Sequence, residues 1–459
     1  MASGLKVVVA GAGPGGCIFA RDLAKAGIDV TVYEKGRSET LGHDWSDAVE
    51  RAALGEVGFD LPPAASTNTG PLVKSKGNAG GIFEEHAYPI MDVWAPDYST
   101  KKKIEFRYIT TDRRALGRLL HRQAADAGVK FVFGHEVIDL LVSGGETLGD
   151  VVVKGMTVRN LQTGEIKNIE ADITVDDTGF NAALRTKLPE KTGIARVFSD
   201  DEFAMVFRTV RRRLKEVRDD LTDHYRYGYK TGYQWAQFLN DDEVDTGAGV
   251  RHNPENPDPK DIVNEFISRH PSITGVVLRG GGGLCLVGRS PSSLVASGFM
   301  TIGDAASQTI PMTGCGAGGA MAGGKYAAET VIKAASEKNT GIATLWDYNW
   351  KWFAGSKRGA NYAGLTAIRN ILQDLTMEDI SFLFRKDILD SAMLTNSING
   401  VFMEPDLKTM LKTLAGGISR PRLLLKLNKA TSAGKKTYRH YMNYPKTWSA
   451  DVFEKWIRM

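Results

Sequence analysis

A glycine-rich turn near the N-terminus has the composition of a phosphate-binding loop. Gly11, Gly13 and Gly16 follow the spacing G-x-G-x-x-G, with Pro14 and Gly15 between the last two. At this spacing the first glycine allows a tight turn, the second lets the backbone approach a pyrophosphate, and the third lets a helix pack against a strand. Backbone N–H groups and the positive end of the helix dipole then attract phosphate oxygens. The sequence therefore predicts a dinucleotide site at this turn.

The segments around the turn are those that a dinucleotide-binding motif requires. An apolar run typical of a buried parallel strand precedes Gly11, a helical pattern runs from about Gly15 to Lys25, and a second strand ends at Glu34. An acid at that place can accept hydrogen bonds from ribose hydroxyl groups. We therefore include Glu34, and Lys35 beside it, in the predicted cofactor site.

A second glycine cluster far along the chain narrows the cofactor to FAD. A strand ends in Gly303-Asp304, and a helix of small residues begins near Gly316. Asp304 can bind a polyol such as the ribityl chain, and the helix start can stabilise a reduced flavin ring. Alternatively, small residues at this spacing serve only close helix packing. The residues predicted to bind the flavin end are Gly303, Asp304, Gly314, Gly316, Ala317 and Gly318.

Composition excludes several other classes of protein. The 459 residues suffice for two or three domains, and 58 Lys and Arg against 54 Asp and Glu argue against nucleic-acid binding. The cysteines Cys17, Cys285 and Cys315 lack C-x-x-C spacing and the eight histidines lack paired spacing, so we expect neither disulfide bonds nor a metal site. A cytoplasmic location fits this pattern. No window holds eighteen apolar residues without a charge, so we expect no membrane-spanning segment.

The C-terminal tail is basic although the whole chain is nearly balanced. Residues 401–459 contain 12 Lys and Arg against 4 Asp and Glu, interleaved with large apolar residues such as Trp448, Phe453 and Trp456. Such a mixture suits peripheral contact with an anionic membrane. A solvated face on a helical cap is the alternative.

The pattern of strands and helices predicts an α/β fold with three parts. A Rossmann-like FAD-binding domain is expected to be discontinuous, a mainly antiparallel sheet is expected to bind substrate, and a helical basic region is expected to follow. The FAD-binding domain is assigned residues 1–60, 105–185 and 285–340, the substrate-binding domain 61–104 and 186–284, and the C-terminal region 341–459. The run Gly280 to Gly283 has no G-x-G-x-x-G and no helix after it, so it is expected to be a turn or strand bend rather than a second nucleotide motif.

Together the two glycine motifs resemble the flavoprotein family that includes the para-hydroxybenzoate hydroxylase-like monooxygenases and the geranylgeranyl reductases. Asp176-Asp-Thr-Gly179 occupies the place of that family's Asp-x-Thr-Gly signature. The resemblance implies that Arg113, or Arg114 beside it, reaches the flavin or its pyrophosphate. It also implies that the backbone of Val137 meets the adenine. A core or surface role for the two arginines remains the alternative.

More specifically, the chain resembles archaeal geranylgeranyl reductases along nearly all of its length. Asp47-Ala-Val and Tyr233-Gln-Trp235, followed by a Gly-x-Gly strand, are similar to motifs of that group. The resemblance implies FAD-dependent reduction of carbon–carbon double bonds in an isoprenoid lipid or prenyl quinone. Because the sequence offers no second nucleotide motif, electrons would come from an external donor, either NAD(P)H or a protein such as ferredoxin.

The chain departs from that group where a cysteine is expected. Trp45-Ser46 replaces the Cys-Gly that precedes Asp47-Ala-Val in many of its members. This departure keeps a monooxygenase acting on an aromatic or polyene substrate as the second hypothesis. Tyr233 and Trp235 alternate on a strand and so point to one side, which makes them pocket candidates, or else a core pair. Trp45 and Cys315 complete the predicted catalytic residues, with simple packing as the alternative for Cys315.

Overall fold

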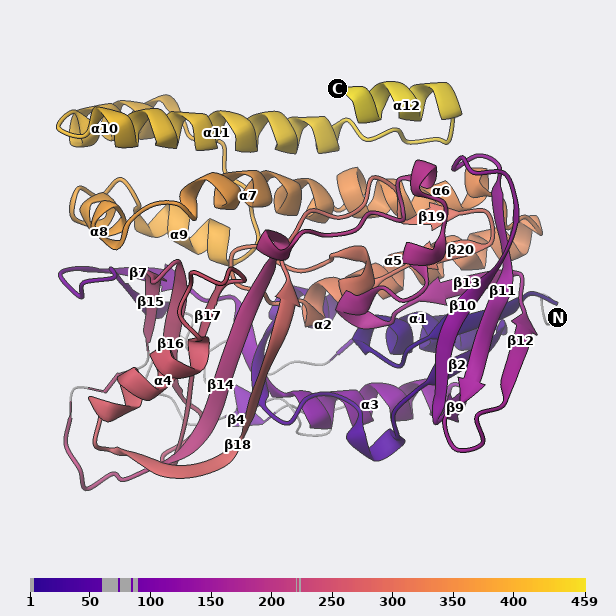
Figure 1. Cartoon of the computed structure of the whole chain (residues 1–459), viewed down its shortest axis with the longest axis horizontal. Helices are drawn as coiled ribbons and strands as arrows, with labels where there is room; N and C mark the ends of the chain where they lie inside the picture. The colour runs from indigo at the N-terminus through magenta and orange to yellow at the C-terminus, as the bar shows by residue number, and fades with distance from the viewer. Residues whose placement is uncertain (1–3, 60–72, 75–83, 86–89, 220, 223) are drawn as a thin grey trace.

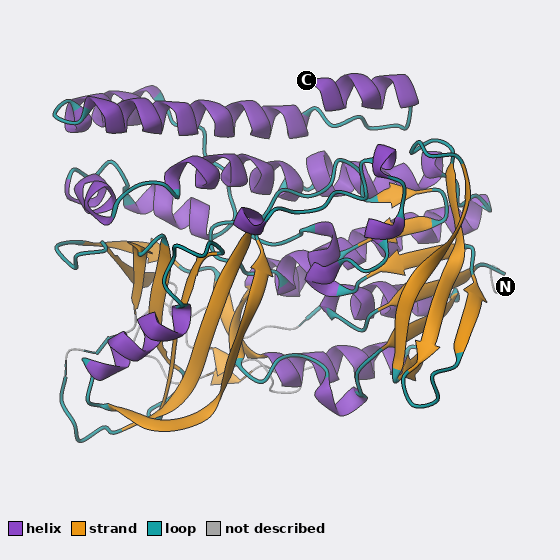
Figure 2. Cartoon of the chain, in the orientation of Figure 1, coloured by secondary structure: helices purple, strands orange, loops and turns teal. Residues whose placement is uncertain are grey.

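The chain is described by a computed structural model that covers residues 4–59, 73–74, 84–85, 90–219, 221–222 and 224–459. Of the predicted substrate-binding segment 61–104, residues 61–72, 75–83 and 86–89 lie outside the described residues. Two large sheets lie side by side, and layers of helices cover them along one edge (Figures 1 and 2).

The first sheet has six strands in the order β19-β20-β13-β1-β2-β9, and neighbouring strands are parallel except β19 and β20. Its apolar strand β1 is buried on both faces, as parallel strands between helices are. The strands are β1 (Lys6–Ala10), β2 (Asp29–Glu34), β9 (Lys130–Phe133), β13 (Ile173–Asp176), β19 (Val295–Ala296) and β20 (Phe299–Thr301). The helices α1 (Pro14–Lys25), α3 (Arg113–Asp126) and α5 (Ala317–Glu337) accompany it.

Three smaller sheets and a short helix lie beside this region. The pair β3 and β8 connects this region to the second large sheet. In the chain, β3 follows β2 of the first sheet, whereas β8 follows the strand Lys101–Glu105 of the second sheet and leads directly into α3. The elements are β3 (Ser46–Glu50), β8 (Tyr108–Asp112), α2 (Arg51–Glu56), β10 (His135–Gly144), β11 (Val151–Asn160), β12 (Ile166–Glu170), β4 (Val73–Lys74) and β5 (Glu84–Glu85).

The second large sheet has seven strands in the order β18-β14-β17-β16-β15-β6-β7 and is antiparallel except between β15 and β6. The strands are β6 (Ile90–Trp94), β7 (Lys101–Glu105), β14 (Phe203–Arg213), β15 (His224–Tyr229), β16 (Gly232–Phe238), β17 (Glu243–Arg251) and β18 (Ile273–Leu286), and α4 (Pro259–Ser268) packs on β14 and β17. The run Gly280 to Gly283 lies inside β18, so of the two alternatives that the sequence left open the turn is wrong and the position within a strand is right. Glycine serves there because a Cβ on Gly280 would lie 2.4 Å from the Arg208 carbonyl oxygen.

Helices form the C-terminal part of the chain. The outermost layer consists of α10, α11 and α12, and α7, α8 and α9 lie between it and the second sheet (Figure 1). The helices are α6 (Ile342–Trp350), α7 (Arg358–Leu372), α8 (Met377–Arg385), α9 (Ser391–Ile398), α10 (Leu407–Gly417), α11 (Pro421–Met442) and α12 (Ala450–Arg458). Gly434 lets α11 approach α7 closely, since a Cβ there would lie 2.7 Å from the Ile368 side chain.

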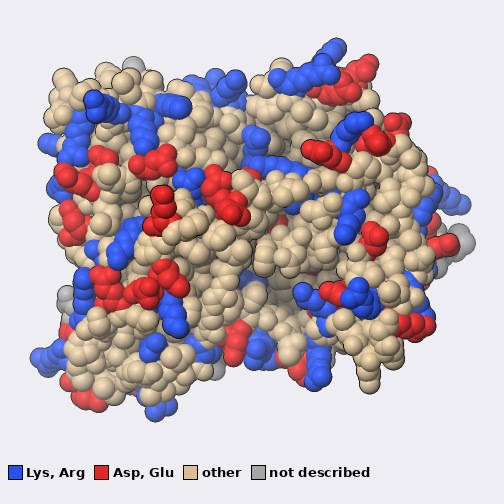
Figure 3. All heavy atoms as spheres, viewed as in Figure 1, with Lys and Arg blue, Asp and Glu red and all other residues tan. Residues whose placement is uncertain are grey.

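The aromatic residues of the tail are placed differently from the sequence expectation. Phe453 and Trp456 are buried in the main hydrophobic core, and Trp448 packs against the Trp346 ring at 4.8 Å between centroids. These rings attach α12 to α6 and do not face outward. Lys and Arg side chains nevertheless lie along the upper edge over α10 and α11 (Figure 3).

Candidate active site

The first glycine turn needs glycine at each motif position because other backbone lies against it. Gly11 has φ +101°, and a Cβ there would lie 2.3 Å from the Asp177 carbonyl oxygen. A Cβ on Gly13 would lie 2.6 Å from the Asp177 carboxyl group, and one on Gly15 would lie 2.8 Å from the Ala320 carbonyl oxygen. The turn therefore begins α1 with its N–H groups at the carboxyl edge of the parallel sheet, as a phosphate site requires.

A cavity of about 360 Å³ opens beside this turn. It is lined by residues that the sequence assigned to the cofactor and by others around them. The assigned residues that line it are Gly11, Gly13, Pro14, Glu34, Lys35, Arg113 and Val137. Gly15 and Gly16 lie in the first turn of α1 itself. The cavity has the size of a ligand site. It lies between the carboxyl ends of β1 and β2 and the start of α3.

Glu34 is fixed in this cavity by backbone donors. Its Oε2 accepts a hydrogen bond from Ala12 N at 2.9 Å, and its Oε1 accepts one from Gly36 N at 2.7 Å. Each carboxylate oxygen has further lone pairs for a ribose hydroxyl group. The acid at the end of β2 is thus oriented before any ligand binds.

Asp177 lies in the signature Asp176 to Gly179 but was not among the residues predicted to form this site. Its Oδ2 accepts a hydrogen bond from Gly16 N at 2.9 Å, and the residue is buried under the glycine turn. Burial raises the pKa of its carboxyl group well above the usual range, with Asp176 and Asp304 adding to the shift. The available signal was its position directly after β13, since the carboxyl ends of neighbouring parallel strands meet at one edge.

The second glycine turn lies at the same edge. Asp304 Oδ1 accepts a hydrogen bond from Thr309 Oγ1 at 3.2 Å, and a Cβ on Gly316 would lie 2.9 Å from that oxygen. Burial raises the pKa of Asp304, whereas the Arg113 cation lowers it. A Cβ on Gly318, in the first turn of α5, would lie 2.0 Å from Glu50 Oε2. The second turn therefore brings Asp304 and the N-terminus of α5 toward Arg113.

Close helix packing is also a real function of these small residues. A Cβ on Gly324 of α5 would lie 2.3 Å from the Gly15 carbonyl oxygen of α1. The α1 and α5 helices thus touch through glycine backbone. Of the two interpretations that the sequence left open, helix packing therefore accounts for Gly324, and ligand approach stays a prediction for Gly314 and Gly316.

The two adjacent arginines have different surroundings. Arg113 Nη1 lies 3.0 Å from Asp47 Oδ2, and Arg113 lines the cavity. Arg114 Nη1 lies 3.3 Å from Asp44 Oδ1 at the surface. Arg113 is therefore the member of the pair that faces the cofactor cavity.

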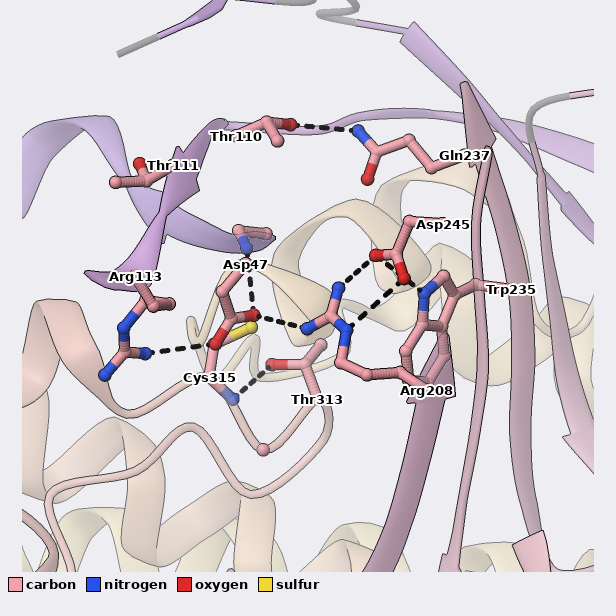
Figure 4. A network of polar contacts seen from close by, with 12 residues as sticks. Asp47, Thr110, Thr111, Arg113, Arg208, Trp235, Gln237, Asp245, Thr313 and Cys315 are labelled. Atoms are coloured by element: carbon pink, nitrogen blue, oxygen red, sulfur yellow. Dashed lines mark hydrogen bonds and ion pairs between the residues drawn. The ribbon is translucent and has the colours of Figure 1, made fainter. Parts of the chain in front are cut away.

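Asp47 connects Arg113 to the second sheet (Figure 4). Its Oδ1 lies 3.2 Å from Arg208 Nη1 of β14, and Arg208 also pairs with the buried Asp245 of β17. Trp235 Nε1 donates a hydrogen bond of 3.4 Å to Asp245 Oδ2. Four charged groups with alternating sign thus run from α3 across β3 to β14 and β17.

Tyr233 and Trp235 lie over two glycines of the neighbouring strand. In the register of β16 and β17, Trp235 is opposite Gly247 and Tyr233 is opposite Gly249. A Cβ on Gly247 would lie 2.1 Å from the Trp235 indole, so glycine is required for the ring to lie across β17. The ring centroids of Tyr233 and Trp235 are 5.5 Å apart, and Tyr233 Oη donates to the Thr313 carbonyl oxygen of the second glycine turn.

Cys315 lies close to Asp47 (Figure 4). Burial and the Asp47 carboxylate raise the pKa of its thiol to about 12. Burial raises the pKa values of Tyr225 and Tyr233, and a negative charge on the Cys315 sulfur would raise them further. Cys315 therefore remains a protonated thiol at neutral pH, enclosed by phenol rings.

Trp45 has different neighbours from the other three predicted catalytic residues. Its ring stacks on His43 at 4.3 Å, and a Cβ on Gly281 of β18 would lie 3.1 Å from it. Its carbonyl oxygen accepts a hydrogen bond from Arg113 N at 3.1 Å. Trp45 thus borders the cofactor side, where His43 lines the cavity.

A second, mainly apolar cavity of about 170 Å³ lies between the second sheet and α7, α8 and α9. The sequence prediction missed it because its walls come from segments more than a hundred residues apart. It reaches Tyr233 and the second glycine turn at one side. Representative lining residues are Val206, Tyr233, Gly314, Leu365, Leu383, Leu394 and Phe402. The two cavities therefore lie on either side of the charged and aromatic residues around Asp47.

Two glycine-bordered helix starts on a parallel sheet, facing an antiparallel sheet, define a flavin-binding oxidoreductase fold. The FAD dependent oxidoreductase family matches residues 6–255. The chain belongs to this family, and the predicted FAD cofactor and fold class are confirmed.

Curated relatives match most of the chain. A protein named digeranylgeranylglycerophospholipid reductase from Sulfolobus acidocaldarius is 24% identical over 97% of this chain and 94% of its own length. A protein of the same name from Methanothrix thermoacetophila is 27% identical over 75% of this chain and 82% of its own length. The resemblance predicted from the motifs is thereby confirmed.

Solved structures share the fold at low identity. A geranylgeranyl bacteriochlorophyll reductase-like protein from Thermoplasma acidophilum has a TM-score of 0.67 at 18% identity, covering 93% of this chain and 99% of that one. A flavin-dependent brominase has a TM-score of 0.59 at 16% identity, covering 91% and 99%. The fold therefore serves several kinds of flavin chemistry, and the site must decide between them.

Proposed function

We propose that this enzyme reduces carbon–carbon double bonds in the isoprenoid chain of a lipid. The observation that carries the proposal is the apolar cavity, which reaches Tyr233 and Gly314 of the second glycine turn and continues beneath α7, α8 and α9. An apolar chain would gain about 0.8 kcal/mol for each CH₂ group that it buries there. The names of the curated relatives that match the chain agree with this substrate class.

The protein's own residues would hold FAD at the two glycine turns. Glu34 would accept hydrogen bonds from the ribose, the N-terminus of α1 would face the phosphates, and Arg113 and Asp304 would lie at the flavin end. When bound and reduced, FAD supplies a hydride. The predicted external donor, NAD(P)H or a protein such as ferredoxin, would supply the electrons.

Cys315 would supply the proton that balances this hydride. A double bond that gains a hydride on one carbon takes a proton on the other, and burial keeps a proton on Cys315 Sγ. Arg208, whose charge lowers the pKa of that thiol, would stabilise the thiolate that remains. Tyr233, which lines the cavity, would present its ring face to the reacting chain and stabilise developing positive charge, and Trp235, 5.5 Å from it, would support that ring.

Reoxidation of the reduced enzyme under anaerobic conditions tests the proposal. Full-length protein with reduced FAD is mixed with a geranylgeranyl lipid, and the product is analysed by mass spectrometry. We expect flavin reoxidation with a mass gain of two hydrogens for each double bond. Oxygen-dependent turnover that yields a hydroxylated product would instead support the monooxygenase hypothesis.

The lipid substrate implies contact with a membrane, and we place that contact on α10 and the start of α11. None of the described helices is long and apolar enough to cross a bilayer. Met410, Leu411, Leu414 and Ile418 follow each other at helical spacing and are 52%, 57%, 58% and 79% exposed, and Leu425 is 70% exposed. We call these five residues the α10 ridge. Large exposed apolar surfaces of this kind mark sites of interaction.

The basic residues beside the α10 ridge favour an anionic lipid surface as its partner. Arg422 and Lys429 are exposed on the same part of α11. Lys426 Nζ donates to the Asp374 carbonyl oxygen at 3.1 Å, and Arg420 Nη1 lies 3.0 Å from Asp379 of α8. These contacts attach the ridge to the segment 372–380, part of which lines the apolar cavity. Because about 170 Å³ holds part of a lipid and not a whole one, the remainder of the substrate would stay in the bilayer.

A further inference from the structure

Two arginines, Arg251 and Arg369, line the otherwise mainly apolar cavity. Arg369 of α7 lines it and is only 8% exposed. Its Nη1 atom is buried and has no hydrogen-bond partner among the described residues. With the Gln373 amide in the orientation that satisfies both side chains, its oxygen accepts from Arg369 Nε at 3.0 Å and from Nη2 at 2.6 Å. Gln373 therefore holds the Nε–Nη2 edge of the guanidinium, and Nη1 has no hydrogen-bond acceptor among the described residues.

Other donors without partners line the same cavity. Thr231 Oγ1 and Arg251 Nε are both buried and have no hydrogen-bond partner in the part of the chain that the structure describes. The other nitrogens of Arg251 are engaged, since Nη2 lies 3.1 Å from Asp201 and Nη1 lies 3.3 Å from Asp374. The cavity thus contains three unsatisfied donor groups but no unsatisfied acid.

A buried guanidinium without an anion is unfavourable. Burial lowers the pKa of Arg369 to about 10, and the nearby Arg251 cation adds to this shift. Arg369 nevertheless remains charged at neutral pH. Native proteins satisfy buried charges with a counter-charge and hydrogen bonds, and a leftover donor in a cavity indicates that a ligand supplies them.

We propose that Arg369 binds the anionic group, a phosphate, of an amphiphilic ligand whose apolar chain lies along the rest of the cavity. Arginine suits this role because its planar donor fork matches phosphate oxygens. The assignment of that ligand as the isoprenoid lipid rests on the function proposed above. Because Tyr233 and Gly314 line the same cavity, a phosphate at Arg369 would direct the chain toward the second glycine turn.

Binding of two ligands with the same chain tests the proposal without turnover. Full-length protein containing oxidised FAD is titrated with geranylgeranyl phosphate and with geranylgeraniol, and affinity is followed by isothermal titration calorimetry. We expect the phosphate ester to bind about 10- to 100-fold more tightly, the range for hydrogen bonds to a charged group. Equal affinities would overturn the proposal.

Three variants locate the preference on Arg369. Arg369→Gln is expected to remove most of the preference for the phosphate ester while changing the affinity for the alcohol less than about threefold. Arg369→Lys, which keeps the charge but not the fork, is expected to keep an intermediate preference and serves if the glutamine variant does not fold. Arg385→Gln removes a cation of α8 that pairs with Asp97 and lies outside the cavity lining. A preference that survives in Arg369→Gln, or is lost equally in Arg385→Gln, would refute the assignment.

Inorganic phosphate distinguishes two sources of the anion. Displacement of geranylgeranyl phosphate only by a large molar excess of inorganic phosphate would identify a lipid head group as the ligand. Displacement at comparable concentrations would assign Arg369 to free phosphate and refute the amphiphile. A protein that prefers the phosphate ester but does not reduce its double bonds would refute the proposed reaction and leave this site intact.

Discussion

Asp47 and Arg208 form an ion pair of 3.2 Å that connects the nucleotide-binding region to the seven-stranded sheet. Asp47 lies on β3, which leads from the first sheet, and Arg208 lies in the middle of β14. Because Arg113 is bound to the other oxygen of the same carboxylate, one side chain joins a cation of the cavity beside the first glycine turn to a cation of the second sheet. The Asp47 carboxylate is thus one of the contacts between the two regions.

Replacing that acid should affect both stability and turnover. Asp47→Asn leaves Arg113 and Arg208 without a shared anion, and we expect a loss of about 1–3 kcal/mol in the free energy of unfolding. The Asp47 side chain is about a quarter exposed, so solvent limits the loss. Thermal unfolding and the anaerobic rate of flavin reoxidation measure the two effects.

The matched control for this change is Asp44→Asn. Asp44 pairs with Arg114, but its side chain is 56% exposed, so its removal should cost no more than about 1 kcal/mol. If the two variants were equally stable and equally active, Asp47 would have no special role.

Two adjacent aspartates should respond to amide substitution with opposite signs. Burial raises the pKa of Asp177, so its folded state holds a proton that the unfolded chain releases near pH 4. As the pH rises from the unfolded pKa toward the folded one, this difference in proton binding costs about 1.4 kcal/mol of stability for each pH unit. Asp177→Asn removes that cost, and we expect it to raise the melting temperature at pH 7 and to lose this advantage near pH 4.

Asp176→Asn is the control with the opposite expectation. Its two oxygens accept hydrogen bonds from Thr178 N, Thr178 Oγ1, Leu184 N and Arg185 N. An amide nitrogen would face some of these donors, so we expect a loss of about 1–3 kcal/mol at pH 7. A lower melting temperature in both variants would show that Asp177 is ionised in the folded protein.

The sequence was most informative where one local segment makes the whole feature. The turn at Gly11, the acid Glu34 and the strand end at Gly303 each depend on neighbours within a few residues, and their spacing identifies the cofactor. The role of Asp177, although the residue lies in a recognised signature, was not predicted because its partner, Gly16, is 161 residues away. The same reason applies to Arg369 and to the apolar cavity, whose walls only the folded chain brings together.

Side-chain direction was the other limit of the sequence prediction. Alternation correctly put Tyr233 and Trp235 on one face, but only the register with β17 shows that Gly247 and Gly249 make room for them. Helical spacing likewise could not tell that Trp456 faces α11 and the core whereas Leu414 faces outward. Which face a helix buries is decided by its tertiary neighbours.

Gly247→Ala tests the pairing of ring and glycine. The added methyl group would lie 2.1 Å from the Trp235 indole, so the ring must move. We expect a loss of about 1–3 kcal/mol in stability and a shifted tryptophan fluorescence spectrum. Gly283→Ala in β18 is the control, because no atom lies within 4 Å of a Cβ there, and it should be neutral. Equal effects at the two sites would mean only a general preference for glycine in this sheet.

Cys315 can be tested as the proton donor by removing the thiol. Cys315→Ala should retain FAD, since the glycine turn is unchanged, but should slow anaerobic reoxidation by lipid about 100-fold, within the range for general acids. Because the thiol pKa is about 12, the wild-type rate should show no titration of this group between pH 6 and 9. An acid with so high a pKa stays protonated throughout that range.

Cys285→Ser is the control for the loss of a nearby sulfur. Cys285 Sγ donates a hydrogen bond of 3.2 Å to the Gly314 carbonyl oxygen, and a serine hydroxyl group can do the same. A wild-type rate in Cys315→Ala would assign the proton to water or to another group.

The α10 ridge predicts how the protein meets its substrate. We expect the protein to sediment with vesicles containing phosphatidylglycerol and to bind neutral phosphatidylcholine vesicles at least tenfold more weakly, with a difference that shrinks as salt rises. A variant with Leu411, Leu414 and Ile418 all replaced by serine should lose vesicle binding, because each leucine or isoleucine contributes up to about 1.5–3 kcal/mol when buried. Its turnover of a detergent-dispersed lipid should remain close to that of the wild type, since these residues lie outside the cavity lining.

Val197→Ser is the matched control for this variant. Val197 is 80% exposed, as large an exposure as any in the α10 ridge, but lies outside the tail. Loss of vesicle binding in both proteins would indicate a general effect of surface hydrophobicity. Sedimentation as a dimer that the three serines convert to a monomer would mean that the ridge binds a second copy of the chain. Only vesicle binding that requires the ridge, in a protein that stays monomeric, agrees with an enzyme that draws an isoprenoid chain from a bilayer into the cavity beside Arg369.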